Sequence, residues 1–291
     1  MKSAIIILNY NDYKTTAKLV DEVRNYSIPD HIVVVDNMST DNSYEELSKI
    51  SGDDVRVSVI KAPSNGGYAK GNNFGIRYAI KEYDVDTIFV ANPDVSISEE
   101  TFRKLSEVIN QPDIIKDSKI GVVAPIVNQG ANVWRLPGFI GMVESLFLVW
   151  FNIDKRFIKK KLTKSEKEVE RVGVVEGSFF CISRNAYDAI DGLDENTFLY
   201  VEENILAKRL RNKGFCEAIL TKERYDHFHS VSIKKKYRGS KAKAFHNFYN
   251  SMTYYNKQYL KTGSIRNFIF DIFYALAYFE RIIYDIVKRF I

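Results

Sequence analysis

The residues best suited to chemistry are Asn92, Pro93 and Asp94, which follow an uncharged run of apolar and β-branched residues at 87–91. Such a run predicts a strand buried on both faces of a parallel sheet. Because Pro93 cannot donate to a sheet ladder, the strand must end there, and open α/β sheets bind ligands at this carboxyl edge. Asp94 could hold a divalent cation and, through it, a diphosphate. The alternative is a simple turn.

Polar side chains also follow each of the three preceding predicted strands. Asn9 ends the first strand, Asp36 ends the second, and Asn65 follows the third, with Lys70 in the helix that comes next. One such residue alone is commonly a helix cap, but four strand ends in succession indicate a shared binding edge. Their amide and carboxylate groups can hydrogen-bond a pyrimidine and a ribose, and Lys70 can neutralise a diphosphate.

Two adjacent acids, Glu202 and Glu203, begin a predicted helix that continues through Leu206 and Leu210 and ends near Gly214. Acids in a first helical turn complement the helix macrodipole, which explains the pair without any chemistry. The functional alternative is that one of them is a general base at a strand-to-helix junction. From the residues alone, both interpretations remain open.

Two of the four histidines, His227 and His229, are separated by a single residue in a segment that follows this helix. On a strand or an extended loop, this spacing places both side chains on one face. They are therefore candidates for a further metal or phosphate ligand, and the alternative is a structural role.

Alternating strands and helices organise the front of the chain. Strand–helix repeats of this kind predict an α/β fold, with a mostly parallel sheet and helices on both faces. The predicted strands are 4–8, 31–35, 55–60, 87–91, 120–127 and 174–183, and the predicted helices include 13–26, one ending near residue 50, one ending near residue 83 and one that Ser98 opens. Residues 134–171 fit this pattern less well, and we interpret them as a mobile lid or an acceptor-side insertion.

The composition is that of an ordinary globular protein, with 45% hydrophobic and 27% charged residues in a chain of 291. Cys181 and Cys216 lie in apolar segments, which indicates buried thiols in a reducing compartment and argues against a disulfide framework. The apolar run at 4–8 is too short for a signal peptide or a membrane span. We therefore expect a cytoplasmic protein.

Residues 234–291 differ from the rest of the chain. They carry 12 Lys and Arg against 3 acids, whereas residues 1–233 carry 30 against 34. Aromatic residues recur there at helical spacing, which predicts one or two helices. These helices could pack on the main body or on a second copy as a homodimer. Alternatively, they could lie on the anionic inner face of the cell membrane as interfacial helices.

Together these motifs resemble those of the family 2 glycosyltransferases, which have the GT-A fold, and especially the bacterial rhamnosyltransferase-like branch. The resemblance covers most of the first 260 residues and rests on the order and spacing of the motifs. They are Asn9-Tyr10-Asn11, Val35-Asp36-Asn37, Asn65-Gly66-Gly67, Asn92-Pro93-Asp94, the segment from Gly177 to Arg184, Gly192-Leu193-Asp194-Glu195 and Tyr200-Val201-Glu202-Glu203.

The resemblance implies a donor site with a metal. In that family the first two strand ends hold the nucleotide, so Asn9 and Asp36 would contact the base and the ribose. The motif that is Asn92-Pro93-Asp94 here is usually Asp-x-Asp, and its last Asp binds Mg²⁺ or Mn²⁺. Asp94 would therefore bind the cation, with His227 as a further ligand and Asn92 in the donor site.

The resemblance also implies an inverting transfer. The family's base belongs to an acidic pair and aligns with Glu203, with Glu202 as the alternative, while an Asp common further downstream is Ile205 here. The donor would be dTDP-rhamnose or a UDP-hexose. The acceptor would be a hydroxyl of a glycan or of a polyprenyl-diphosphate-linked molecule in cell-surface polysaccharide synthesis. No nucleic-acid partner is expected.

The expected organisation is a catalytic domain at 1–233 and a helical tail at 234–291. Within the domain, residues 1–127 would bind the donor and residues 128–233 the acceptor. A glycoside hydrolase would also use two carboxylates, but it needs no nucleotide-binding strand ends. The other alternative is a catalytically degenerate protein kept as a membrane-associated assembly subunit, which the departures from the family motifs at Asn92, Glu203 and Ile205 suggest.

Overall fold

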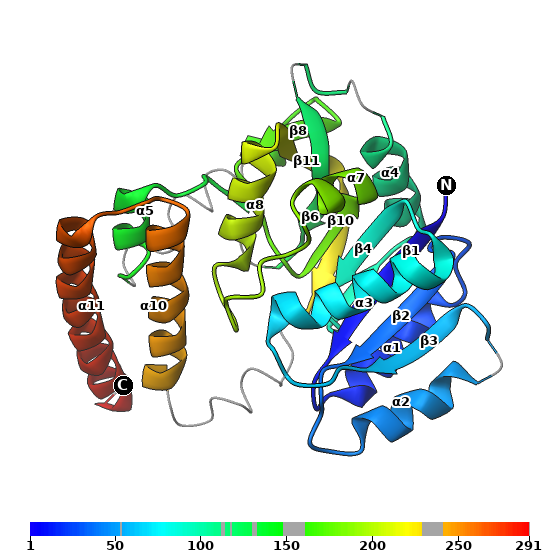
Figure 1. Ribbon diagram of the computed structural model, residues 1–291, viewed down its shortest axis with the longest axis horizontal. Coiled ribbons are helices and arrows are strands. Elements are labelled where there is room, and N and C mark those ends of the chain that lie inside the picture. The colour runs from blue at the N-terminus through cyan, green and yellow to red at the C-terminus, as the bar shows by residue number, and fades with distance from the viewer. Residues whose placement is uncertain are drawn as a thin grey trace.

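Strands and helices alternate through the front of the chain, as the hydrophobic pattern predicts (Figure 1). The computed structural model describes residues 1–52, 54–111, 114–116, 118–129, 133–147, 161–228 and 241–290. The first elements are β1 (Ser3–Asn9), α1 (Tyr13–Val23), β2 (His31–Asp36), α2 (Ser43–Ser51), β3 (Val57–Lys61), α3 (Tyr68–Tyr83), β4 (Thr87–Ala91), β5 (Val95–Ile97) and α4 (Glu99–Ile109). Ser98 caps α4 as predicted, since its Oγ accepts the Thr101 amide at 3.2 Å.

The later elements build the second half of the sheet and a separate pair of long helices. They are β6 (Lys119–Val127), β7 (Val133–Trp134), α5 (Phe139–Glu144), β8 (Val169–Val172), β9 (Val174–Val175), β10 (Phe179–Ser183), α7 (Arg184–Ala189), α8 (Glu202–Asn212), β11 (Phe215–His227), α10 (Lys241–Gln258) and α11 (Ser264–Phe290). The described part of the tail thus contains two helices, within the range predicted.

Among the described residues, nine strands form one mixed sheet in the order β3-β2-β1-β4-β10-β6-β11-β5, with β8 also paired to β11. The first four strands in this order run parallel, and β10 runs antiparallel between β4 and β6. In the parallel part, Asn9 lies opposite Asp36, and Asp36 lies opposite Lys61. The register therefore brings the polar strand ends together along one edge.

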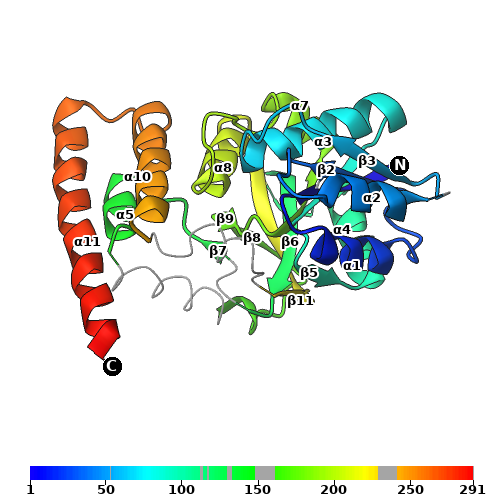
Figure 2. The ribbon, with the colours of Figure 1, turned by 90° about the horizontal axis from the view of Figure 1, so that it is seen from below.

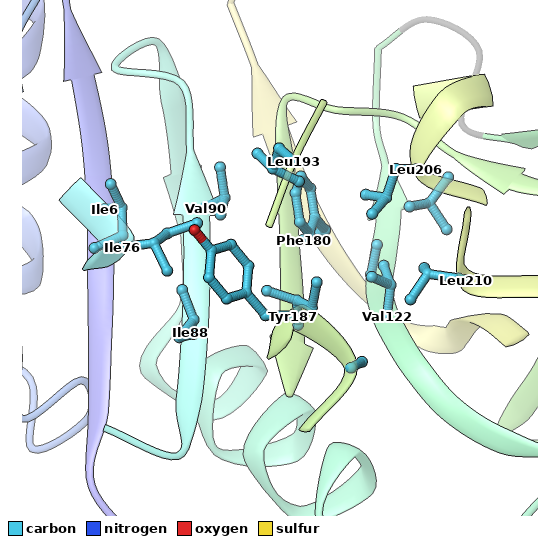
Figure 3. Close-up of a cluster of buried hydrophobic side chains, with 14 of the residues drawn as sticks. Ile6, Ile76, Ile88, Val90, Val122, Phe180, Tyr187, Leu193, Leu206 and Leu210 are labelled. Atoms are coloured by element: carbon cyan, nitrogen blue, oxygen red, sulfur yellow. The ribbon is translucent and has the colours of Figure 1, made fainter. Parts of the chain in front are cut away.

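Helices cover both faces of this sheet, as predicted (Figure 2). On one face, α3, α7 and α8 pack on the strands, and Figure 3 shows Ile76 of α3 and Leu206 of α8 within that core. On the other face, α1, α2 and α4 bury a second apolar cluster, which contains Leu19, Leu47 and Phe102. Each fully buried aliphatic side chain contributes roughly 1.5–3 kcal/mol.

A third apolar cluster joins the tail helices to α5 and to the start of α8. It contains Met142 of α5, Ile205 of α8, Met252 of α10, and Phe270 and Ala277 of α11. In Figures 1 and 2, α10 and α11 stand side by side at one end of the molecule, with α11 outermost. Across the described residues, no helix combines the length and hydrophobicity needed to cross a bilayer.

The structure corrects the prediction of one continuous strand at 174–183. The chain forms β9 and then β10, and Glu176, Gly177 and Ser178 turn between them. All three residues lie against the candidate site described below. The hydrophobic pattern on either side hid the break, because Gly177 and Ser178 are compatible with a strand. Of the segment 134–171, residues 148–160 lie outside the described part, and the remainder contains α5 and β8.

Gly67 fixes how the donor-side helix α3 meets the later part of the chain. Its φ of +88° is in the left-handed region, and a Cβ there would lie 2.1 Å from the Phe198 carbonyl oxygen. Only glycine fits such a position. As a result, the Tyr68 amide donates to the Phe198 carbonyl at 3.1 Å, which holds α3 against the segment that leads into α8.

Candidate active site

The two predicted metal ligands, Asp94 and His227, are in contact although they are far apart in sequence. His227 Nε2 lies 3.4 Å from Asp94 Oδ1. The antiparallel pairing of β5 with β11 sets this contact, because His227 lies opposite Val95. The other ring nitrogen, Nδ1, lies 3.2 Å from Glu176 Oε1. Two carboxylates therefore hold the imidazole from opposite sides. His229, the alternative ligand, lies outside the described residues.

The charge on His227 follows from these contacts. Burial lowers its pKa, but the hydrogen bonds with Asp94 and Glu176 outweigh burial and raise the pKa to about 9. A cation bound at Nε2 would replace the proton there, and Glu176 would then accept the remaining Nδ1–H. A ring nitrogen held by a carboxylate is the usual arrangement of a metal-ligating histidine. Sequence reasoning missed Glu176, because the contact that places it at the site comes from His227, which is distant in sequence.

Asp94 and His227 fit a cation that takes few protein ligands. Among the described residues, no group of three or more His, Cys, Asp or Glu side chains forms a preformed metal centre. One carboxylate and one imidazole leave most of a coordination sphere to water and phosphate oxygens. Mg²⁺ at phosphate sites is bound in this way, and Mn²⁺ accepts similar oxygen-rich surroundings.

Asn9 and Asp36 lie side by side at the ends of β1 and β2. Asn9 Nδ2 donates to Asp36 Oδ1 at 3.1 Å, and Asp36 Oδ2 accepts the Ser39 amide at 3.1 Å. Thr16 Oγ1 donates to Asn9 Oδ1 at 2.8 Å. Both side chains are completely buried. The pair thus stabilises the strand-end loops from within, and its contact with a base and ribose stays a prediction.

The remaining predicted donor residues lie along the same strand ends. Asn65 Oδ1 accepts the Gly67 amide at 3.3 Å and so shapes the turn into α3. Lys70 is exposed in the first turn of α3. Asn92 lines the cavity of about 570 Å³ that is described below, and its backbone amide donates to the Ser178 carbonyl at 2.8 Å. Lys70 and Asn92 are therefore accessible to a ligand, whereas Asn65 has a role in the loop.

Glu202 and Glu203 begin α8 after two residues in the left-handed region. Tyr200 has a φ of +77° and Val201 a φ of +72°. This conformation is unusual for a non-glycine residue and particularly for a β-branched one. Local backbone strain of this kind clusters at functional sites. Glu202 and Glu203 therefore follow directly on a strained stretch of backbone. Acids that only complemented the helix macrodipole would not require such strain.

The two acids have different surroundings. Glu203 lies against Gly177, where an added Cβ would be only 3.1 Å from both Cγ and Oε1 of Glu203. Burial, reinforced by the charge of Glu203, raises the pKa of Glu202 well above its ordinary value. Within the described part of the chain, Glu202 Oε1 is buried without a hydrogen-bond partner. A neutral carboxylic acid is consistent with that position.

A cavity of about 570 Å³ connects these groups. Asn92, Glu176 and His227 line one part of it, and Glu202 and Glu203 line another. The opposite wall comes from the segment at 134–145, which includes α5, and from α10, through residues that sequence reasoning did not assign to a site. They are Trp134, Arg135, Leu136, Pro137, Gly138, Gly141, Met142, Glu144, Ser145 and Phe248. Trp134 is held there because its Nε1 donates to Asn204 Oδ1 at 2.7 Å.

Comparison with known proteins places this site in a family. The model of glycosyl transferase family 2 matches residues 4–187, which include β1, the strand-end motifs and Asp94. The chain belongs to glycosyl transferase family 2. The family resemblance that the motifs indicated is therefore confirmed.

Two curated relatives illustrate the neighbourhood within the family. The low-salt glycan biosynthesis hexosyltransferase Agl10 of Haloferax volcanii is 30% identical over 223 residues, which cover 74% of this chain and 65% of that protein. The dTDP-rhamnosyl transferase RfbF of Shigella flexneri is 24% identical over 217 residues, with shares of 74% and 65%. The matched region thus spans slightly less than two thirds of either relative. The second is named a dTDP-rhamnosyl transferase, in line with the rhamnosyltransferase-like branch that the motifs indicated.

Solved structures confirm the predicted GT-A fold. A mannosyltransferase from Pyrobaculum calidifontis, in complex with GDP-Man and Mn²⁺, superposes with a TM-score of 0.58, at 14% identity over 95% of this chain and 69% of that one. S. aureus TarS 1–349 in complex with UDP-GlcNAc gives a TM-score of 0.56, at 14% identity over 96% of this chain and 73% of that one. At such low identity the likeness concerns the fold.

Proposed function

We propose that this chain is an inverting glycosyltransferase that moves a sugar from a nucleoside diphosphate donor to an acceptor hydroxyl. The observation that carries the proposal is the single cavity that Asn92, His227 and Glu203 line together. It joins the candidate donor residue Asn92 and the candidate metal ligand His227 to the candidate base. The cavity lies at the carboxyl edge of strands, where α/β folds bind ligands.

The donor we propose is dTDP-rhamnose or a UDP-hexose. The name of the Shigella relative supports a dTDP-rhamnosyl donor, and the TarS complex with UDP-GlcNAc supports a uridine nucleotide. Asn9 and Asp36 would hold the base and ribose after a small opening of their loops. The exposed ammonium group of Lys70 would pair with the diphosphate.

Asp94 and His227 would hold Mg²⁺ or Mn²⁺. Glu176 would keep His227 in the tautomer whose Nε2 is available to a cation. When bound, the cation supplies positive charge that stabilises the departing diphosphate. The Mn²⁺ in the Pyrobaculum mannosyltransferase complex supports this choice.

Glu203 is the base in this proposal. The acceptor hydroxyl gives its proton to the Glu203 carboxylate while its oxygen forms a bond to the anomeric carbon. The bond from that carbon to the diphosphate breaks, and its electron pair leaves with the diphosphate. Attack from the opposite face inverts the anomeric centre without a protein nucleophile. Glu202 is the poorer base in this proposal, since burial raises its pKa and favours the protonated form.

The acceptor we propose is a glycan or a polyprenyl-diphosphate-linked molecule. The cavity of about 570 Å³ extends to a wall from α5 and α10, which presents Met142 and Phe248. The O-antigen chain rhamnosyltransferase RfbN of Salmonella typhimurium, 20% identical over 244 residues, supports a surface-glycan acceptor by its name. A degenerate assembly subunit would have no use for a cavity that joins these groups.

A thermal-shift panel of nucleotide sugars, each with and without Mn²⁺, tests the proposal. A ligand present at about 100 times its Kd stabilises a folded protein by about 2.7 kcal/mol. We expect dTDP-rhamnose or a UDP-hexose to raise the Tm in Mn²⁺, and to release its nucleoside diphosphate when an acceptor is added. Failure of every nucleotide sugar to shift the Tm in Mn²⁺ would refute the donor site.

A further inference from the structure

Helix α11 has two apolar faces, and the described residues of the chain cover only one of them. The inner face packs on α10 and α5 through Phe270 and Ala277, which are buried. The outer face consists of large apolar side chains that are between 37% and 78% exposed. They are Ile265, Phe268, Ile269, Ile272, Leu276, Phe279, Ile282, Ile283 and Ile286. We call these nine residues the outer stripe.

The spacing of the outer stripe makes it one continuous surface. Its residues recur at intervals of three and four, which places them on one side of an α-helix. None of these positions carries a charge, and the acids Asp271 and Glu280 fall outside the stripe. From Ile265 to Ile286 the stripe extends about 30 Å at 1.5 Å per residue. Exposed apolar surfaces of this extent mark interaction sites.

The position of α11 leaves the outer stripe open. In both Figure 1 and Figure 2, α11 forms the outer edge of the molecule, on the far side of α10 from the sheet. The inner side of the same helical unit reaches the cavity through Phe248 of α10 and Met142 of α5. Whatever covers the outer stripe is therefore separated from the cavity by α11 itself and by the layer of α5 and α10 behind it.

Basic residues accompany the stripe. Lys257, Lys261 and Arg266 are exposed around the turn between α10 and α11, and Lys288 and Arg289 follow the stripe in sequence. Residues 234–291 as a whole carry 12 Lys and Arg against 3 acids. A second copy of the chain would bring two such basic tails together. Anionic lipid headgroups would neutralise this charge.

We propose that the outer stripe of α11 lies in the surface of an anionic lipid bilayer, parallel to the membrane plane. An amphipathic helix with aromatic and aliphatic side chains on one face, and basic residues near it, binds bilayers in this way. Together with the proposed function, this attachment places the α5–α10 wall of the cavity close to the lipid surface. An acceptor carried on a lipid could enter from that side.

Vesicle co-sedimentation of the full chain tests the proposal. The probes are vesicles of phosphatidylcholine alone and vesicles of phosphatidylcholine mixed with phosphatidylglycerol, each at low and high salt. We expect wild-type protein to sediment with the phosphatidylglycerol vesicles at low salt, and much less in the other three conditions, because the attraction is partly electrostatic. Protein that stays in the supernatant with phosphatidylglycerol vesicles at low salt overturns the proposal.

A triple substitution separates the stripe from the general positive charge. Phe268→Asp, Leu276→Asp and Ile283→Asp add three charges to the exposed face and leave the buried face of α11 intact. We expect this variant to lose vesicle binding by at least about tenfold, because charges cannot enter the acyl boundary.

A matched control adds the same three charges elsewhere. Asn25→Asp, Asn42→Asp and Ser48→Asp fall at exposed positions in and around α1 and α2, far from α11. We expect this control to bind within about twofold of wild type, since the stripe is unchanged. Equal losses in the two variants would mean that net charge alone drives binding, which overturns the role of the stripe.

Two further measurements keep the result decisive. Circular dichroism shows whether the triple variant remains folded, and the lipid and salt dependence of the wild type stands without any variant.

Light scattering after gel filtration reports the oligomeric state. A wild-type dimer that the triple variant dissociates, with no vesicle binding by either protein, would assign the stripe to a second copy and overturn the membrane proposal. Nucleotide-sugar binding is measured separately, so failure here leaves the donor site untouched.

Discussion

Glu202 and Glu203 are adjacent, yet their surroundings suit them to different roles. We expect Glu203→Gln to keep donor binding and to lose transfer by roughly 10²–10⁴, because the amide preserves shape but cannot accept the acceptor's proton. Calorimetric donor affinity and initial transfer rates measure the two effects separately. The control is Glu202→Gln, which should retain more activity because burial raises the pKa of Glu202 and so favours its neutral form. An inactive Glu202→Gln beside an active Glu203→Gln would exchange their roles.

Glu176 offers a second test at the scale of one side chain. Its Oε1 lies 3.2 Å from His227 Nδ1, so Glu176→Gln should weaken the orientation of the imidazole. We expect Mn²⁺ affinity, measured by electron paramagnetic resonance with a nucleoside diphosphate present, to fall by about 10–100-fold. Asp226→Asn is the matched control, because Asp226 binds Asn128 and Gln129 instead. Unchanged Mn²⁺ affinity in Glu176→Gln would remove this positioning role.

The buried acid Glu217 on β11 should make the stability of the folded protein depend on pH. It accepts the Val175 amide at 2.7 Å, and burial raises its pKa from 4.5 to about 8. Between these values the unfolded chain loses a proton that the folded chain keeps, so stability falls as pH rises. The effect is on the order of a few kcal/mol across this window. Urea unfolding of wild type and Glu217→Gln should show a shallower slope with pH in the variant. Identical slopes would mean that folded Glu217 is ionised.

At the scale of elements, the strand ends were predictable and the turn between β9 and β10 was not. Asn9, Asp36 and Asp94 each follow a local apolar run, and a parallel sheet necessarily collects such ends at one edge. By contrast, the turn at Glu176 depends on contacts with β11 and α8, which are distant in sequence. No local pattern around Glu176 signals those contacts.

The docking of α10 on the main body is an element-scale prediction. Asp194 accepts hydrogen bonds from Tyr254, at 2.8 Å, and from Tyr259, both in or just after α10. Burial raises the pKa of Asp194, but the hydrogen bonds from Tyr259, Asn196 and Tyr254 together outweigh burial and lower that pKa. We expect Tyr254→Phe to cost about 1 kcal/mol and to speed hydrogen exchange in residues 192–200. Tyr249→Phe is the control, because the Tyr249 hydroxyl bonds Asp271 within the helical pair. Equal exchange in both variants would contradict this docking role.

For the whole molecule, the α/β architecture followed from the alternation of strands and helices, whereas the shape of the site did not. The sequence indicated that the tail was helical and basic. It could not indicate that α5 and α10 complete the cavity, because that wall depends on packing between segments a hundred residues apart, such as Met142 and Tyr255. Charge and periodicity describe a segment, and only the packed structure shows which surface it adjoins.

The central claim is that Asp94 and His227 make this cavity a metal-dependent site for a nucleoside diphosphate. Calorimetric titration of dTDP and UDP into wild type and Asp94→Asn, each with and without Mn²⁺, tests it most directly. The account predicts that Mn²⁺ strengthens nucleotide binding to the wild type and has no such effect on the variant, with the melting temperature of both proteins nearly the same. Equal Mn²⁺-dependent affinity in the two proteins would contradict it.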